Sequence, residues 1–124
     1  MKRSIAASLL ICTALLLAGC SFENKYEREA DKITRAVMNN DLTPVKNDIA
    51  PGVNISRVKI AEYADELSAQ GKLESVKETT PCQAGPGFHC FIVKFEKRSY
   101  LEDLAMDDQG KVTQWNFKPA DAAT

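Results

Sequence analysis

Residues 91–118 read FIVKFEKRSYLEDLAMDDQGKVTQWNFK, and apolar side chains recur at every second position through much of this stretch. A period of two predicts half-buried β-strands, because successive side chains of a strand point to opposite faces. In the last strand, Thr113, Trp115 and Phe117 are expected to share one face. Asp107-Asp108-Gln109-Gly110 predicts a tight hairpin, with glycine where a positive φ is needed. The expected strands span residues 72–80, 91–96, 100–107 and 111–118.

The part of the chain before these strands has the helical period. Apolar side chains follow one another at steps of four, three and four residues, at Tyr26, Ala30, Ile33 and Val37. Thr43 followed by Pro44 is typical of a helix start, with the threonine as N-cap, and predicts a short helix over 45–49. A third helix is expected from an N-cap at Ser56 to a glycine stop at Gly71.

Helices followed by an antiparallel meander predict an α+β fold, with N-terminal helices packed on a four-stranded antiparallel curved sheet. We expect one domain at residues 25–118 and a flexible tail at 119–124. Four aromatic side chains alternate along the strands. We expect them to pack against the helices as part of the core or, alternatively, to line an apolar ligand cavity. They are Phe91, Phe95, Trp115 and Phe117.

The first 19 residues differ from the rest. Lys2 and Arg3 precede an apolar run from Ile5 to Leu17, and no acidic residue occurs among them. This run has the length of the apolar region of a secretory signal peptide. It is shorter than the roughly 20 residues that a membrane-spanning helix needs. Residues 1–19 are therefore expected to be a signal peptide.

Leu17-Ala18-Gly19-Cys20 resembles the lipobox of bacterial lipoproteins. The resemblance implies cleavage before Cys20 and attachment of a diacylglycerol to its sulfur, with residues 20–24 as lipidated N-terminus and short linker. Two or three acyl chains hold a protein stably on a bilayer. Ser21, the residue after the cysteine, implies transport to the outer membrane of a Gram-negative envelope, with the domain facing the periplasm.

Two cysteines are expected to remain as thiols, because Cys12 leaves with the signal peptide and Cys20 is acylated. In an exported protein, Cys82 and Cys90 are expected to form a disulfide. Zinc is also bound by cysteine and histidine side chains, which occur here at Cys82, His89 and Cys90. A tetrahedral zinc site, however, needs a fourth ligand. We expect no metal and no cofactor.

The segment between these cysteines is a candidate partner-binding loop. Gly85 and Gly87 flank a proline and predict a turn, while Phe88 offers an aromatic anchor and His89 a polar tip. A rigid loop loses less freedom on association. The alternative is a staple that only stabilises a long hairpin.

The composition excludes several classes of protein. The 124 residues are 44% hydrophobic, with 16 Lys and Arg against 17 Asp and Glu, as in ordinary globular proteins. Without a basic patch, no nucleic-acid partner is expected. His89 is the one histidine, and sequential carboxylates such as Glu102-Asp103 point to opposite faces, so no catalytic site is predicted.

Four stretches together resemble small bacterial lipoproteins of the nuclear-transport-factor-like (cystatin-like) superfamily. The resemblance implies a curved sheet around a long helix, in a group whose members bind steroids, small acids or proteins. In isomerase-like members an aspartate and a tyrosine project into the cavity; the residues of these types here include Tyr26, Tyr63, Tyr100 and Asp103. The stretches are Asn40-Asp41, Thr43-Pro44, GKLESV at 71–76 and DDQGKV at 107–112.

Two functional hypotheses follow, and a structural or assembly role in the envelope stays open as a third class. The first is a lipid-anchored envelope protein with a non-enzymatic binding domain for a protein or other envelope component, with inhibitor or immunity proteins as specialisations. The alternative is a carrier of a small apolar ligand, or an isomerase-like enzyme, that uses a cavity between helices and sheet. A well-formed pocket with convergent polar groups favours the second hypothesis, and a filled core favours the first.

Overall fold

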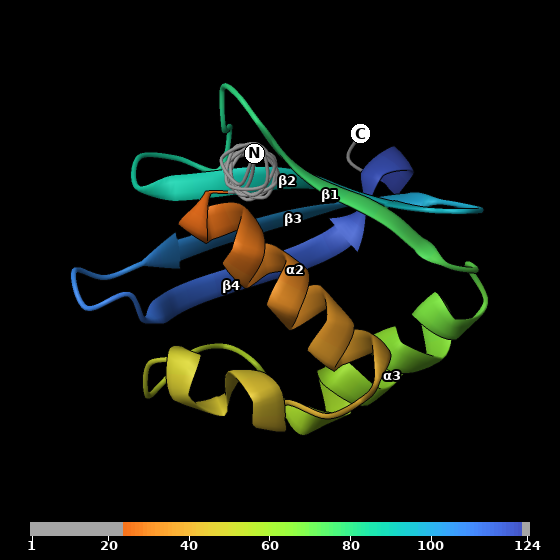
Figure 1. Cartoon of the computed structure of the whole chain (residues 1–124), viewed down its shortest axis with the longest axis horizontal. Coiled ribbons are helices and arrows are strands. Elements are labelled where there is room, and N and C mark those ends of the chain that lie inside the picture. The colour runs from red at the N-terminus through yellow and green to blue at the C-terminus, as the bar shows by residue number, and fades with distance from the viewer. Residues whose placement is uncertain (1–23, 123–124) are drawn as a thin grey trace, which may run out of the picture.

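The computed structural model describes residues 24–122, so the expected signal peptide and Cys20 lie outside the described residues. Helices precede a sheet in which the four strands are hydrogen-bonded in chain order, β1-β2-β3-β4, all antiparallel. The predicted α+β class is confirmed (Figure 1). The elements are α2 (Lys25–Met38), the 3₁₀ helix η1 (Thr43–Asp48), α3 (Arg57–Ser68), β1 (Leu73–Thr79), β2 (Phe88–Phe95), β3 (Ser99–Met106), β4 (Val112–Pro119) and the 3₁₀ turn η2 (Ala120–Ala122).

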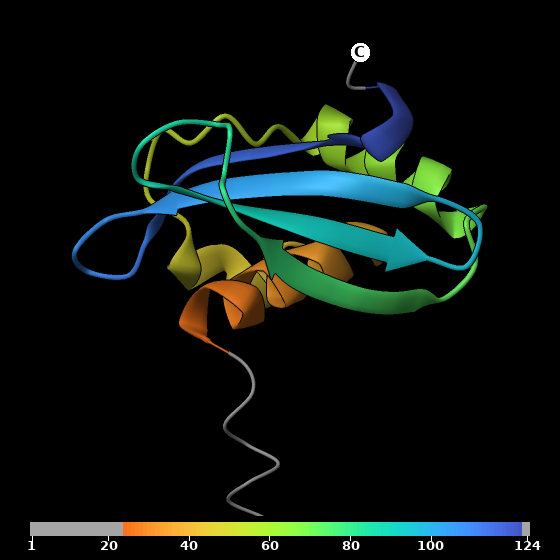
Figure 2. The same cartoon turned by 90° about the horizontal axis from the view of Figure 1, so that it is seen from above.

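The helices form a second layer beside the sheet. α2 crosses the sheet diagonally and contacts β1, β2 and β3, and η1 lies beside it on the same side (Figure 2). α3 contacts α2 and lies next to β4, where the Tyr63 hydroxyl donates to the Phe117 carbonyl oxygen at 2.8 Å. Within residues 24–122, no helix has both the length and the apolar character that crossing a bilayer requires.

The core fills the space between α2 and the sheet. In β2, Phe91, Val93 and Phe95 are buried whereas Ile92 and Lys94 are exposed, as the period of two predicted. α2 contributes the face that its helical period predicted. The buried apolar side chains are Ala30, Ile33, Ala36, Val37, Val45, Ile60, Leu67, Phe91, Val93, Phe95, Tyr100, Leu104, Val112, Trp115 and Phe117.

The predicted face of β4 is wrong at Thr113, which is exposed. A β-bulge is the reason. Ala105 of β3 pairs with Gln114 and Met106 pairs with Val112, so Thr113 is an extra residue on β4. The bulge turns Val112 into the core and leaves the Thr113 hydroxyl donating to the Ala105 carbonyl oxygen at 3.2 Å.

The ends of the helices follow local side-chain chemistry. Ser56 caps α3 as predicted, accepting from the Lys59 amide at 3.2 Å, and Asn24 caps α2 in the same way. Thr43 was expected as an N-cap, but Leu42 occupies that position without a side-chain bond. Thr43 instead begins η1, and its amide donates to Asp41 Oδ1 at 3.0 Å. The short helix therefore begins two residues earlier than expected and is a 3₁₀ helix.

Three hydrogen bonds from the helical half reach backbone groups of the outer strands of the sheet. On β4, the Val112 carbonyl oxygen accepts from the Ala50 amide at 2.9 Å, in addition to the Tyr63 bond to Phe117. On β1, the Glu78 amide donates to Glu27 Oε2 of α2 at 2.9 Å. Backbone groups at both edges of the sheet are thus paired with groups from outside it.

Candidate functional site

A glutamate lies inside the core. Glu102 of β3 is 1% exposed. One carboxyl oxygen accepts from the Trp115 indole nitrogen at 2.7 Å, and the other lies 2.8 Å from the Thr34 hydroxyl of α2. Burial raises the pKa of Glu102 to about 8, because the charged form loses its hydration, and this outweighs the bonds from Trp115 and Thr34.

Hydrogen counting around Thr34 also indicates a neutral Glu102. The Thr34 hydroxyl lies 2.8 Å from the Ala30 carbonyl oxygen and 2.8 Å from Glu102 Oε1, yet it carries a single hydrogen. Both contacts are hydrogen bonds when a protonated Glu102 donates to the hydroxyl and the hydroxyl donates to Ala30. The carboxyl group is then satisfied by protein groups alone, which suits a structural role.

A second carboxyl group with a shifted pKa lies on α2. Burial, followed by the neighbouring Asp48, raises the pKa of Glu29 to about 7. Asp48 itself accepts from the Lys32 ammonium at 2.7 Å, and this bond lowers the pKa of Asp48. Glu29 therefore holds the proton of the pair, and Asp48 carries the charge that pairs with Lys32.

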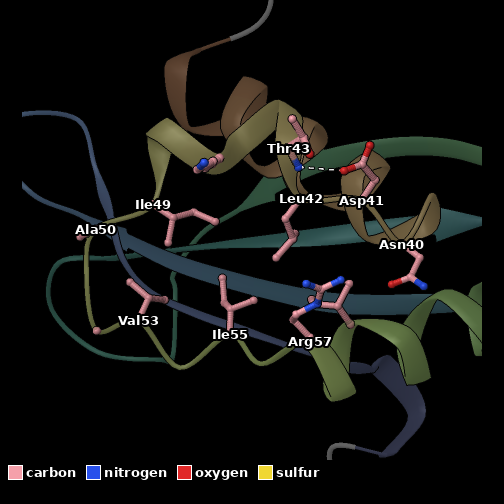
Figure 3. Close-up of a pocket in the computed structure, with 12 residues that line it drawn as sticks. Asn40, Asp41, Leu42, Thr43, Ile49, Ala50, Val53, Ile55 and Arg57 are labelled. Carbon is pink, nitrogen blue, oxygen red and sulfur yellow. Dashed lines mark hydrogen bonds between the residues drawn. The ribbon is translucent and has the colours of Figure 1, made fainter.

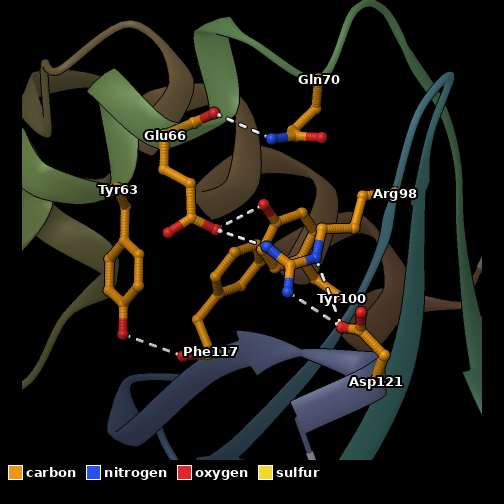
Figure 4. Close-up of polar contacts among 7 residues, drawn as sticks. All are labelled: Tyr63, Glu66, Gln70, Arg98, Tyr100, Phe117 and Asp121. Atoms are coloured by element: carbon orange, nitrogen blue, oxygen red, sulfur yellow. Dashed lines mark hydrogen bonds and ion pairs between the residues drawn. The ribbon is translucent and has the colours of Figure 1, made fainter.

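A third polar cluster joins α3, β3 and η2 (Figure 4). The buried Tyr100 hydroxyl donates to Glu66 Oε2 at 2.5 Å, and Arg98 lies 3.7 Å from the same oxygen. Arg98 also donates to Asp121 at 3.0 Å, which ties η2 to the domain where the sequence predicted only a tail. Burial, and then the Glu66 bond, raise the pKa of Tyr100 to about 12. A tyrosine so weakly acidic holds its proton at neutral pH.

The aspartate and tyrosine types expected from the family resemblance are not brought together. Tyr100 points into the core, whereas Asp103, three residues on along the same strand, accepts from the Asn116 side chain on the opposite face. Tyr63 is committed to the Phe117 carbonyl oxygen, and Tyr26 stacks on His89. Asp103 lines neither the pocket at the end of α2 nor the smaller pocket beside Tyr63.

The His89 side chain packs against α2 and not at the rim of the loop between Cys82 and Cys90. Its ring stacks on Tyr26 with centroids 3.5 Å apart, and its Nδ1 lies 2.7 Å from Glu78 Oε2. Glu78 also accepts from the Asn24 side chain at 2.9 Å. The polar tip expected at His89 is therefore bonded to Glu78 and turned towards α2 by the alternation along β2, and its part in partner binding stays a prediction.

The rest of the candidate loop retains its turn geometry. The sulfur atoms of Cys82 and Cys90 lie at bonding distance, 2.04 Å apart. Gly85 and Gly87 have positive φ values of 123° and 83°. Phe88 is half-buried at the start of β2. Among residues 24–122, no group of three or more His, Cys, Asp or Glu side chains is placed to hold a metal ion.

A pocket that was not predicted lies at the C-terminal end of α2 (Figure 3). It has a volume of about 440 Å³, is open to solvent on one side and is lined by residues that follow α2, by η1, by the irregular segment 49–55 and by the start of α3. Its walls are aliphatic and its rim is polar. The aliphatic side chains are Leu42, Ile49, Ala50, Val53, Ile55 and Ile60, and the polar ones are Asn40, Asp41, Thr43, Lys46 and Arg57.

The four aromatic side chains that were considered for a ligand cavity are buried in the core. Phe91, Phe95, Trp115 and Phe117 are each at most 4% exposed and belong to the core. A smaller pocket of about 190 Å³ lies at the edge of β4, and Trp115 and Phe117 line it together with Tyr63 and Lys59. The aromatic side chains therefore fill the space between helices and sheet.

Comparison with known proteins adds no functional assignment. No protein-family model matches the chain, and no curated protein is significantly similar to it in sequence. The candidate site therefore rests on the geometry of the molecule itself.

Proposed function

We propose that this protein is a lipid-anchored envelope lipoprotein whose domain binds an envelope component without transforming it. The anchor is supported by the signal-length apolar run and by Leu17-Ala18-Gly19-Cys20. Ser21 supports an outer-membrane location facing the periplasm, and the nuclear-transport-factor-like resemblance supports the same class of lipoprotein.

A non-enzymatic role is supported by the state of the titratable groups. Glu102 and Tyr100 have strongly raised pKa values, and both are buried and bonded to other protein groups. A general acid or base must reach a reacting atom in a pocket. The pocket of Figure 3 is lined by neither group.

The single observation that carries the binding role is the 440 Å³ pocket at the end of α2. Ligand sites are concave and mostly apolar, with few polar groups, and have volumes of about 300–1,000 Å³. This pocket has aliphatic walls and charged groups at its rim. The filled core argues against the alternative of a carrier or isomerase that uses the space between helices and sheet.

The anchor is tested by the intact mass of the protein extracted from membranes. We expect a chain that begins at Cys20 and carries the mass of a diacylglycerol, with or without a third acyl chain. Cys20→Ser should release the domain from the membrane or leave an unprocessed precursor. A mature protein without added lipid, beginning at another residue, would end the lipoprotein proposal.

The binding role is tested by capture from solubilised envelopes. The wild-type domain is compared with Val53→Glu, which places a charge among the aliphatic walls at a half-buried position. Retention of an envelope component by the wild type and its loss from the variant is the expected result. Equal retention by both proteins would place the binding surface elsewhere, with the 83–88 loop as the next candidate.

A further inference from the structure

We propose that the pocket at the end of α2 binds an aliphatic chain that ends in a carboxylate, such as a medium-chain fatty acid. This deepens the proposed function, because it names the chemistry of the component that the pocket receives. Three features support it: the aliphatic walls, the two uncommitted cations at the rim, and the volume.

The walls match an alkyl chain. Leu42, Ile49 and Ile55 pack against the core from one side and line the pocket on the other. None of the residues that line the pocket is aromatic. Sugars, nucleobases and quaternary ammonium groups are commonly recognised by aromatic rings, and the pocket offers them no such platform. An alkyl chain needs only apolar surface.

The rim supplies two cations that the rest of the described chain does not neutralise. Lys46 of η1 and Arg57 of α3 both line the pocket, and neither side chain forms a hydrogen bond or ion pair within residues 24–122. Figure 3 shows the Arg57 guanidinium lying over the pocket between Leu42 and Ile55. Arginine matches the geometry of a carboxylate with two parallel hydrogen bonds.

Asp41, the acidic residue of the rim, is already bonded to the protein. It accepts from the Thr43 amide at 3.0 Å, and its bonds to Thr43 lower its pKa. The rim therefore carries two positive charges against one negative charge that is turned towards Thr43. This balance favours an anionic ligand and disfavours an amine.

The volume is sufficient for a medium-chain fatty acid. A pocket of about 440 Å³ corresponds to about fifteen water molecules at roughly 30 Å³ each. Dodecanoate, with about fourteen non-hydrogen atoms, is of this size. The pocket lies at the opposite end of α2 from Asn24, and the fourteen residues of this helix span about 20 Å. The titration below uses Cys20→Ser, so that no lipid attached to Cys20 competes for the pocket.

The test is a titration of the chain from residue 20, carrying Cys20→Ser, with dodecanoate below its micelle concentration. Binding is followed by calorimetry and by amide chemical shifts. We expect a dissociation constant of about 100 μM or tighter, with shifts at residues 42, 49, 53, 55 and 57. Dodecanol and dodecylammonium, which lack the carboxylate, should bind at least tenfold more weakly.

Variants at the rim test the role of charge. Arg57→Ala and Lys46→Ala should each weaken dodecanoate binding by about tenfold, since a hydrogen bond to a charged group commonly contributes this much. Lys59→Ala is the matched control, because Lys59 is exposed on the same helix and lies outside this pocket. Circular dichroism checks that each variant is folded.

Several outcomes would overturn the proposal. They are equal affinity for dodecanoate and dodecanol, unchanged affinity in Arg57→Ala and Lys46→Ala, no binding at 1 mM dodecanoate, or shifts confined to the smaller pocket beside Trp115. Dodecanoate vesicles and monomeric dodecanoate, tested separately, distinguish a bilayer source from a dissolved one. The membrane-anchor proposal is judged independently by the mass of the natural protein.

Discussion

Replacing Glu102 with glutamine should stabilise the protein at neutral and alkaline pH. Glutamine keeps the shape of the side chain, donates to the Thr34 hydroxyl and accepts from the Trp115 indole, so both contacts of the neutral glutamate are retained. What it removes is the ionisable group. In the wild type, folding opposes the deprotonation of Glu102, which occurs freely in the unfolded state. The glutamine variant has no such deprotonation to oppose.

The size of the effect follows from the shift in pKa. The pKa of Glu102 rises from 4.5 to about 8 on folding, so the native state binds the proton more tightly. The contribution of this group is fully present below pH 4.5 and is lost as the pH rises towards 8. At about 1.4 kcal/mol per pH unit, the advantage of Glu102→Gln over the wild type should grow by about 3 to 4 kcal/mol between pH 5 and pH 8. This is a large fraction of a typical unfolding free energy of about 5–15 kcal/mol.

Urea denaturation at several pH values, followed by Trp115 fluorescence, measures the difference. Two variants serve as controls. Glu102→Leu also removes the titration but leaves the Thr34 and Trp115 groups without a partner, so it should be less stable than Glu102→Gln at every pH. Glu62→Gln removes an exposed carboxylate of α3. A difference between Glu102→Gln and wild type that stays constant, or grows towards acid pH, would show that Glu102 is ionised in the folded protein and refute the reasoning.

Three further predictions concern stability and the loop. Trp115→Ala should lower the unfolding free energy by about 3–5 kcal/mol, because a buried aromatic side chain is lost; an unchanged melting temperature would contradict this. Replacing both Cys82 and Cys90 by serine should lower the unfolding free energy by about 2–3 kcal/mol, because the constraint on the loop is lost. Phe88→Ala with the disulfide intact should melt close to wild type. Capture of envelope partners by Phe88→Ala then shows whether the loop takes part in binding. Glu29→Gln should stabilise the protein at pH 8 and progressively less towards pH 5, since folding raises the pKa of this carboxyl to about 7; denaturation curves at the two pH values give the sign.

The architecture could be predicted from the sequence because the helices and strands show regular hydrophobic periods. The alternation of Phe91, Val93 and Phe95 and the helical spacing of Ala30, Ile33 and Val37 each survive in the structure without interruption. Thr113 escaped prediction because a bulge adds one residue, and a period of two cannot signal where the count changes. Such an irregularity depends on pairing with another strand.

The candidate site was harder to predict for physical reasons. Glu102 stands next to Asp103, and an acidic pair normally indicates exposure. Its burial depends on Thr34, which lies 68 positions earlier in the chain. The pocket is lined partly by segment 49–55, where no helical or strand period operates. The available signal was Pro51-Gly52 with aliphatic residues at 49, 53 and 55. Apolar side chains in an irregular segment either cover the core or line a pocket that is partly exposed to solvent.

The contacts at the two edges of the sheet also govern how copies of this protein meet. An exposed edge strand invites pairing with another chain. Here, Tyr63 and Ala50 occupy carbonyl oxygens of β4, and Glu27 occupies an amide of β1. A second molecule that tried to extend the sheet would have to displace these groups first. Pairing between copies of this protein through β1 or β4 is therefore opposed at these three positions.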